Sequence, residues 1–261
     1  MDPAWLARNI RTSWRYRDAF PDFIKRLLWI YSNNLPPEIG SPQWLIGFNY
    51  PKVTGRIRLL LRSNAGSDSF IHGEVFEHQY YDLGLTFAPK TILDLGANIG
   101  LTCIYFARCF PEAAIACVEP MPSNLTVLRR NLELNGVNAT VFPGAIDAGD
   151  GHLFMEVEHM DYGHRVADLA RAPANNKVEV TAYSIPTLVR RLGWERIGLL
   201  KVDIEGHEKV LLSGDAGWAH LVDAMCVECH EGFGERDLED FARRFGFRPP
   251  KRLPGIWLLE R

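Results

Sequence analysis

The chain of 261 residues lacks several features that would each point to a particular class of protein. It has no apolar run of about 18 residues, so no transmembrane helix is expected. Its five cysteines, an odd number, favour reduced thiols over a disulfide framework. The net charge of -3 provides no basis for nucleic-acid binding. Because nothing resembles a secretion signal, we expect a cytoplasmic protein. The hydrophobic content of 47% is sufficient for a full buried core.

The chain also lacks the middle glycine of a dinucleotide-binding turn. An apolar run containing Asp94 leads into a helical pattern through Gly96 and Gly100, and the dinucleotide fingerprint G-x-G-x-x-G has a third glycine between them. Glycines let the backbone approach a ligand closely, and the helix start offers free N–H groups. The turn therefore predicts a nucleoside site without a pyrophosphate, for which S-adenosylmethionine is the common ligand.

A carboxylate follows at the position expected for a ribose contact. A second apolar run, residues 114 to 118, leads to Glu119, which stands 19 residues after Gly100. Such a residue accepts hydrogen bonds from ribose hydroxyl groups. A nicotinamide oxidoreductase would use the same carboxylate and stays an alternative, although the missing glycine disfavours it.

A second polar cluster closes two later strands. Lys201, Asp203 and Glu205 share one side of a strand end, while Glu228 and His230 follow the next strand. Because adjacent parallel strands end at the same edge of a sheet, we expect these groups in one crevice. Asp203 could act as a general base, or could bind Mg²⁺ or another divalent cation with Glu228 and His230. The acids could instead only pair with Lys201.

From residue 91 onward, strand and helix patterns alternate as in a doubly wound α/β fold. Residues 151–157 and 177–183 alternate polar and apolar side chains, which predicts an added antiparallel pair. The polar segment between them, residues 158–176, would be a substrate lid, with His164 as a further candidate base. A helix over 235–245 and a strand over 255–260 close the chain.

The first 90 residues include the predicted N-terminal extension, residues 1–70. Residues 4–31 mix aromatic and basic side chains in two short amphipathic helices, which would pack on their own domain, form a homodimer or bind a membrane surface. Residues 56–62 alternate as a strand, and residues 74–81 predict a helix that borders the site. His78, Tyr80 and Tyr81 are candidate substrate contacts or wall residues.

Three motifs together resemble the FkbM family of S-adenosylmethionine-dependent methyltransferases: residues 94–100, residues 118–120 and residues 201–208. The resemblance covers roughly residues 70 to 232. It implies a Rossmann-like class I methyltransferase fold, with a mostly parallel seven-stranded sheet and an antiparallel last strand, over residues 71–261, preceded by an extension over 1–70. The family usually transfers methyl groups to hydroxyl oxygens of sugars or natural-product scaffolds, so a small hydroxylated acceptor is expected. Transfer to an amine nitrogen is the nearest alternative.

The resemblance also assigns roles to residues. The cofactor would contact Asp94, Gly96, Ala97, Asn98, Gly100, Glu119, Pro120, Met121, Ala145 and Ile146. Met121 would lie against the adenine, with Ala145 and Ile146 on its other side. The reacting end would hold Asp203, Glu228, His230 and Lys201, of which the first three are the candidate metal ligands.

Overall fold

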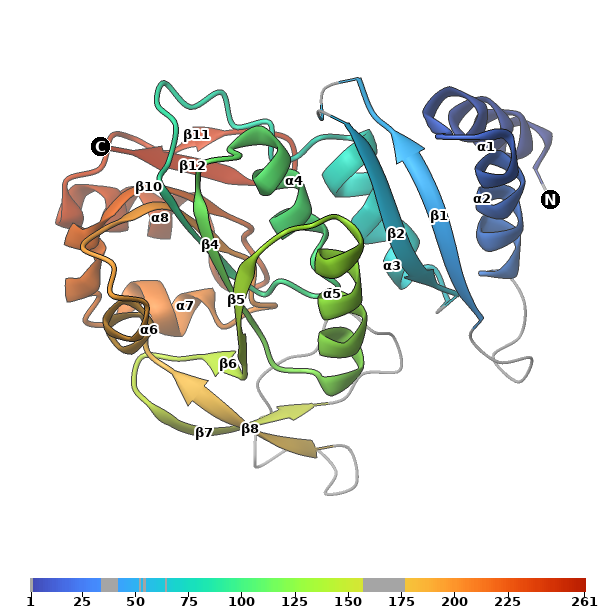
Figure 1. Ribbon diagram of the computed structural model, residues 1–261. Helices are drawn as coiled ribbons and strands as arrows, with labels where there is room; N and C mark the ends of the chain where they lie inside the picture. The colour runs from blue at the N-terminus through green and yellow to red at the C-terminus, as the bar shows by residue number, and fades with distance from the viewer. Residues whose placement is uncertain (1, 34–41, 52, 54, 64, 157–176) are drawn as a thin grey trace.

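The computed structural model describes residues 2–33, 42–51, 53, 55–63, 65–156 and 177–261 (Figure 1). A seven-stranded sheet with the order β11-β12-β10-β9-β3-β4-β5 forms its centre. These strands are β3 (Thr91–Leu95), β4 (Ala114–Glu119), β5 (Ala139–Pro143), β9 (Ile197–Val202), β10 (Val222–Val227), β11 (Lys251–Arg252) and β12 (Trp257–Glu260). The five strands from β10 to β5 are parallel, and β12 runs antiparallel to β10 and β11. The predicted Rossmann-like class I fold is confirmed.

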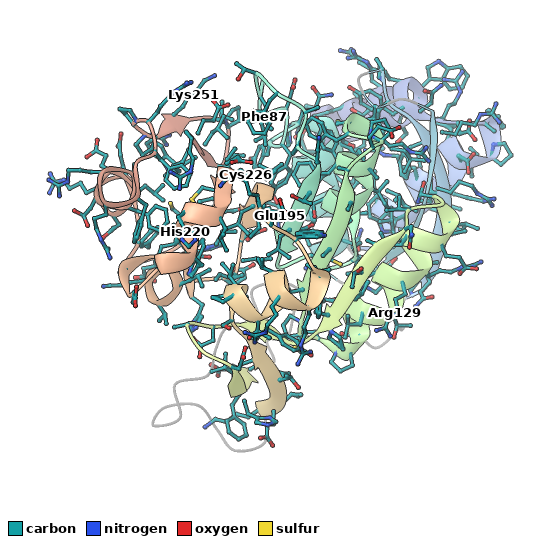
Figure 2. The ribbon with its side chains drawn as sticks, turned by 60° about the vertical axis from the view of Figure 1, so that its left-hand side comes forward. Phe87, Arg129, Glu195, His220, Cys226 and Lys251 are labelled. Atoms are coloured by element: carbon teal, nitrogen blue, oxygen red, sulfur yellow. The ribbon has the colours of Figure 1, made fainter. Side chains whose placement is uncertain are left out.

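Helices cover both faces of this sheet, as strands that are apolar on both sides require. Along β3, Ile92 belongs to one buried cluster and Leu93 to the other. The helices are α4 (Leu101–Cys109) and α5 (Pro122–Leu134) on the first face, and α6 (Ile185–Leu192), α7 (Glu208–Ser213) and α8 (Glu235–Phe245) on the second. Cys226 lies inside the sheet and Lys251 at its outer edge (Figure 2).

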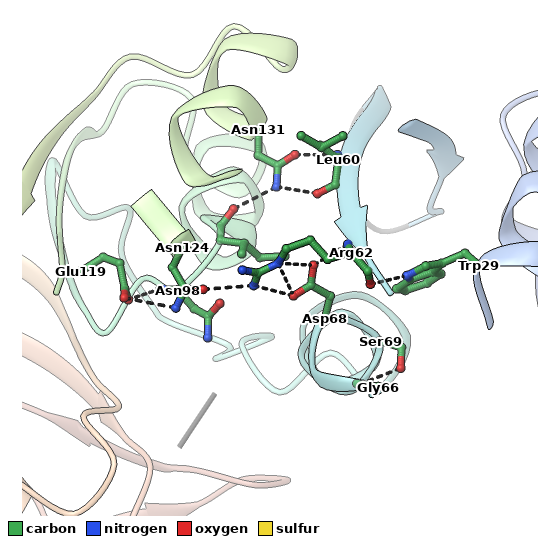
Figure 3. A network of polar contacts seen from close by, with 11 residues as sticks. Trp29, Leu60, Arg62, Gly66, Asp68, Ser69, Asn98, Glu119, Asn124 and Asn131 are labelled. Carbon is green, nitrogen blue, oxygen red and sulfur yellow. Dashed lines mark hydrogen bonds and ion pairs between the residues drawn. The ribbon is translucent and has the colours of Figure 1, made fainter. Parts of the chain in front are cut away.

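The N-terminal extension shares the first of these two clusters. It comprises α1 (Pro3–Tyr16), α2 (Phe20–Ser32), the antiparallel hairpin β1 (Gln43–Asn49) and β2 (Arg56–Arg62), and the start of α3 (Ser67–His72). A π-helical turn η2 (Gly73–Glu77) follows α3 directly. Phe48 and Leu59 pack in one cluster with Ile92 and Leu128. The Asn131 side chain on α5 binds both backbone groups of Leu60, at 2.7 and 3.2 Å (Figure 3). The buried core is thus continuous across residue 70, and a boundary there stays a prediction.

The helix predicted over 74–81 begins earlier and ends earlier in the structure. Gly66, in the left-handed region with φ 95°, turns the chain into α3, and Asp68 lies in its first turn. The helix continues as the π-helical turn and stops before Gln79, whose φ of 56° is incompatible with a right-handed helix. Glycine and serine, which stand at 66 and 67, favour turns and helix starts over helix interiors, so the sequence gives a weak helix signal there.

A small three-stranded sheet, order β6-β8-β7, flanks the carboxyl edge of the central sheet. It contains β6 (Ala145–Ile146), β7 (Gly151–Glu156) and β8 (Lys177–Tyr183). The pairing of β7 with β8 is antiparallel, as predicted, and β6 adds to β8 in parallel. The candidate lid over 158–176, with His164, lies outside the described residues.

Within the described ranges, no helix has the length and apolarity needed to cross a membrane.

Candidate active site

A cavity opens where four neighbouring strands β10, β9, β3 and β4 end. Open α/β sheets bind ligands at this edge. The predicted residues that line the cavity are Gly96, Ala97, Asn98, Glu119, Pro120, Met121, Ala145, Ile146, Lys201, Asp203 and Glu228. Asp94, Gly100 and His230 do not line the cavity, but each contacts a residue that does. Asp94 pairs with Lys201, the backbone N–H of Gly100 donates to the carbonyl oxygen of Ala97, and His230 lies 3.4 Å from Glu205.

The glycines of the first turn are required by the backbone itself. Gly96 has a φ of 81°, and a β-carbon there would lie 1.8 Å from the carbonyl oxygen of Asp203. Gly100 has a φ of 83° and lies against Leu128 of α5. Both positions need a residue that adopts the left-handed region without strain. The close approach at Gly96 brings the first motif directly against the strand end that carries Asp203.

Glu119 is held by three donors. Its carboxylate accepts hydrogen bonds from the backbone N–H groups of Asn98 and Met121, both at 2.9 Å, and from Nδ2 of Asn124 at 3.2 Å. The residue is 4% exposed. Burial raises the pKa of Glu119 to about 7, although these hydrogen bonds oppose the rise. Its carboxylate therefore gains or loses a proton near neutral pH.

A polar chain leads from Glu119 to the N-terminal extension (Figure 3). Asn124 accepts a hydrogen bond from Nη2 of Arg62 at 3.0 Å, and Arg62 forms an ion pair with the fully buried Asp68 at 2.8 Å. A guanidinium held on two sides has a fixed orientation. Sequence reasoning missed Arg62, Asp68 and Asn124, because none of them belongs to a motif.

Lys201, which lines the cavity, forms an ion pair with Asp94 behind it. Nζ of Lys201 lies 3.0 Å from Asp94 and 3.3 Å from Asp203, and it donates to the carbonyl oxygen of Gly96 at 2.9 Å. Burial lowers the pKa of Lys201, but the charges of Asp94 and Asp203 outweigh it and hold the pKa above its usual value. Asp94 also accepts a hydrogen bond from the hydroxyl group of Thr102. Together with Asp203, it keeps Lys201 positively charged.

Further carboxyl groups line the cavity, including those of Glu74 and Glu228. Burial, followed by the charges of Asp203 and Glu74, raises the pKa of Glu228 to about 8. Burial and Asp203 also raise the pKa of Glu74 to about 7. Glu74 comes from the π-helical turn, a local distortion that often marks functional sites. The sequence predicted a helix beginning at Glu74 that borders the site, but it did not indicate a functional role for the Glu74 carboxyl group.

Among the three aromatic candidates, Tyr81 lines the cavity, whereas His78 and Tyr80 do not. The Tyr81 ring centroid lies 5.9 Å from Nζ of Lys201. Tyr81 is therefore part of the cavity wall, close to Lys201.

His230 is fixed by buried Glu208. Its Nδ1 lies 3.0 Å from Glu208, and its Nε2 lies 3.4 Å from Glu205 and 4.0 Å from Asp203. Burial lowers the pKa of His230, but the hydrogen bond and charge of Glu208, with the charges of Asp203 and Glu205, raise it to about 9. The imidazole is therefore protonated at neutral pH in this arrangement.

The predicted metal ligands are arranged differently from the expectation. Ligand atoms of Asp203, Glu205 and His230 lie within 4.8 Å of one another, and Glu228 is not part of this group. Glu205 reaches it from a left-handed backbone conformation, φ 55°, in the loop between β9 and α7. Glu208 anchors that loop by accepting from the N–H groups of Ile204 and Gly206 at 2.9 and 3.0 Å.

Comparisons with known proteins agree with these motifs. Residues 94–249 match the family described as the methyltransferase FkbM domain. Methyltransferase 1 of Beauveria bassiana is 30% identical over 193 residues, covering 64% of this chain and 75% of the relative. Methyltransferase sdnD of Sordaria araneosa is 34% identical over 200 residues, with 64% and 76% covered. The 31-O-demethyl-FK506 methyltransferase FkbM of Streptomyces tacrolimicus is 25% identical over 200 residues, again with 64% and 76% covered.

Among solved structures, the methyltransferase FkbM of Methylobacillus flagellatus KT aligns with a TM-score of 0.49 and 14% identity. The alignment covers 98% of this chain, which spans 58% of that protein. The sequence matches alone are sufficient to assign the protein family. They favour a methyltransferase over the nicotinamide oxidoreductase that the sequence left as an alternative. The chain belongs to the FkbM methyltransferase family.

Proposed function

We propose that the protein transfers the methyl group of S-adenosylmethionine to a hydroxyl oxygen of a small molecule, such as a sugar or a natural-product scaffold. The observation that carries the proposal is the division of one cavity into two chemically different halves. Glu119 and the glycine turn line one half, four carboxyl groups surround the other, and Lys201 lies between them. The first half suits a nucleoside, and the second suits removal of a proton.

In the cofactor half, the ribose hydroxyls would donate to Glu119, and the adenine would lie against an apolar cluster. Met121, Ala145, Met155 and Val180 form this cluster. Gly144 lets the chain pass tightly beside it, since a β-carbon there would lie 2.4 Å from the carbonyl oxygen of Thr181. The methionine end would lie beside Gly96 and Ala97, near Asp203.

In the acceptor half, Asp203 is our candidate base. The acceptor oxygen attacks the methyl carbon in line with the carbon–sulfur bond, that bond breaks, and S-adenosylhomocysteine leaves as the neutral thioether. The hydroxyl proton passes to a carboxylate, directly to Asp203 or through Glu228, whose pKa of about 8 suits proton exchange near neutral pH. Fixing both reactants in this geometry would supply roughly 7–11 kcal/mol of the barrier reduction.

A divalent cation fits the same half of the cavity. Asp203, Glu205 and His230 would hold it through two carboxylates and one imidazole nitrogen, provided that His230 loses its proton. Such an ion would supply Lewis acidity that lowers the pKa of the acceptor hydroxyl. Chelation separates the two modes, because a metal-dependent enzyme loses turnover in EDTA and regains it with Mg²⁺ or Mn²⁺.

Transfer to an amine nitrogen is the second candidate, and one observation favours it. The acceptor half contains Glu74, Asp203, Glu205 and Glu228, so it would attract an ammonium group. The bound ammonium group would first lose a proton to one of these carboxylates, and the resulting neutral amine is nucleophilic enough to attack the methyl carbon without Asp203 acting as the base. Retention of activity in Asp203→Ala with an amine acceptor would identify this reaction.

The first experiment is calorimetry with S-adenosylmethionine, S-adenosylhomocysteine and a control titration with NAD. Micromolar binding of the first two ligands, without NAD binding, is the expected result. Mass spectrometry of mixtures with hydroxylated sugars and scaffolds, before and after reaction, would then detect a gain of one methyl group. Absence of cofactor binding would contradict the proposal, and methylation confined to amines would replace it with the second candidate.

A further inference from the structure

The two N-terminal helices present a band of apolar side chains to solvent. We call this the outer face, and it consists of Leu6, Ile10 and Trp14 on α1 with Phe20, Ile24, Leu28 and Tyr31 on α2. Their exposed fractions run from 41% to 60%. Among the described residues, seven of the eleven large exposed hydrophobic side chains lie here, so the apolar exposure is concentrated on this face. Figure 1 shows these helices at the end of the molecule beyond β1.

The outer face is continuous and is not a product of loose packing. Spacings of three or four residues align the side chains along each helix. Ring contacts join the two rows, since Trp14 packs edge-on against Phe23 at 5.4 Å and Phe20 lies 6.0 Å from Phe23. The opposite sides of the helices are firmly attached, because buried Arg26 pairs with Glu77 and Nε1 of buried Trp29 donates to Arg62 at 2.8 Å.

The charges around the outer face are predominantly positive. Residues 2–33 contain six basic and three acidic side chains, whereas the whole chain carries a net charge of -3. Among the six, buried Arg26 is paired with Glu77 on the opposite side of the helices. Two of the three acids bind other parts of the fold, since Asp18 pairs with Arg56 at 2.8 Å and Asp22 accepts from the backbone N–H of Gly47 at 2.9 Å. Arg8, Arg11 and Arg15 are exposed on α1. The helices therefore have the opposite charge to the rest of the chain.

This combination fits the surface of an anionic lipid bilayer. Apolar side chains enter the boundary between headgroups and acyl chains, while arginines beside them contact lipid phosphates. A symmetric contact between two copies would instead bring the exposed arginines Arg8, Arg11 and Arg15 of both copies together, which electrostatic repulsion opposes. We propose that α1 and α2 form a peripheral membrane anchor that binds anionic lipid through the outer face.

Vesicle flotation of the full chain tests this proposal. Vesicles of phosphatidylcholine alone are compared with vesicles that also contain phosphatidylglycerol, at low and high salt. We expect binding to the anionic vesicles, weakened by salt, and little binding to the neutral ones. The absence of binding to anionic vesicles at low salt would overturn the proposal.

Two sets of variants separate charge from apolar insertion. Replacing Arg8, Arg11 and Arg15 by alanine should weaken binding on the order of a hundredfold. The matched control replaces Arg129, Arg236 and Arg248, three exposed arginines outside the N-terminal helices, and should change binding far less (Figure 2 labels Arg129). Leu6→Ser with Ile10→Ser should weaken binding at least tenfold, and Val210→Ser, also at an exposed site, should not.

Circular dichroism would establish that each variant is folded, and analytical ultracentrifugation would test self-association. A dimer that dissociates in the Leu6→Ser, Ile10→Ser variant, without vesicle binding by the unaltered chain, would assign the outer face to a second copy and overturn the lipid proposal. Vesicle binding that neither variant set reduces would also overturn it.

Discussion

Nη2 of Arg62 lies 3.0 Å from Oδ1 of Asn124, and this hydrogen bond joins the N-terminal hairpin to the helix that supports Glu119. Asn124 passes the connection on, since its Nδ2 donates to Glu119 at 3.2 Å. The extension thus orients a group in the cofactor half of the cavity.

Asn124→Ala should weaken cofactor binding and shift its pH dependence. The substitution removes one hydrogen bond to Glu119, so we expect about a three- to tenfold loss of affinity for S-adenosylmethionine. It should also raise the pH at which binding is half-maximal, because the Asn124 hydrogen bond lowers the pKa of Glu119. Asn131→Ala is the control, since Asn131 holds Leu60 and Ile99 and should alter stability without moving that pH.

Cofactor affinity should fall in mild acid. The pKa of Glu119 is about 7, and the ionised form accepts the ribose hydrogen bonds, so affinity should drop about tenfold between pH 8 and pH 6. S-adenosylhomocysteine, which lacks the sulfonium charge, serves as the titrant to limit contributions from Glu74 and Glu228. Glu119→Gln should bind weakly with a flat profile, and a persistent pH slope in this variant would assign the titration to another group.

Asp203→Ala should retain cofactor affinity and lose most turnover. Loss of a general base typically lowers the rate by about 10²–10⁴-fold. Initial rates and calorimetry on the same preparation would separate the two effects, with exposed Glu195→Ala as the control. Unchanged turnover would remove Asp203 from the mechanism.

Glu228→Gln should stabilise the protein at alkaline pH. The folded-state pKa of Glu228, about 8, lies above its unfolded value, so the folded state binds the proton more tightly. This contribution is greatest below the unfolded pKa and is lost as pH rises through about 8. Glutamine avoids that loss, so the melting temperature of the variant relative to the unaltered protein should increase from pH 6 to pH 9. An equal difference in melting temperature between the variant and the unaltered protein at pH 6 and at pH 9 would contradict the prediction.

Gly96→Ala should be far more damaging than Gly136→Ala. Both glycines have positive φ, 81° and 62°, so each substitution incurs left-handed strain of about 1–2 kcal/mol. At Gly136 no other atom lies within 4 Å of the added carbon, whereas at Gly96 the Asp203 carbonyl lies 1.8 Å away. We expect Gly96→Ala to lose more than roughly 4 kcal/mol of unfolding free energy. Denaturant unfolding of both variants measures the difference, and equal losses would mean that the backbone relaxes around the clash.

Local sequence determined the sheet and much of the cavity. The strands near Asp94, Glu119 and Asp203 were predictable because their apolar runs and following glycines are short-range patterns, and parallel strands place their ends at one edge. The predicted cavity contacts of Gly96, Glu119 and Glu228 follow from the same rule. The roles of these residues in binding and catalysis stay predictions.

Tertiary structure alone decided several of the contacts between side chains at the site. Arg62 reaches the site from the N-terminal extension and Glu74 from the π-helical turn that follows it. Glu205 takes the place predicted for Glu228 beside His230. No local pattern encodes these contacts, because they depend on how the hairpin packs on α5 and on a left-handed turn at Glu205. Periodicity in a sequence fixes which face of an element is buried, whereas contact between distant side chains is fixed only when the elements pack.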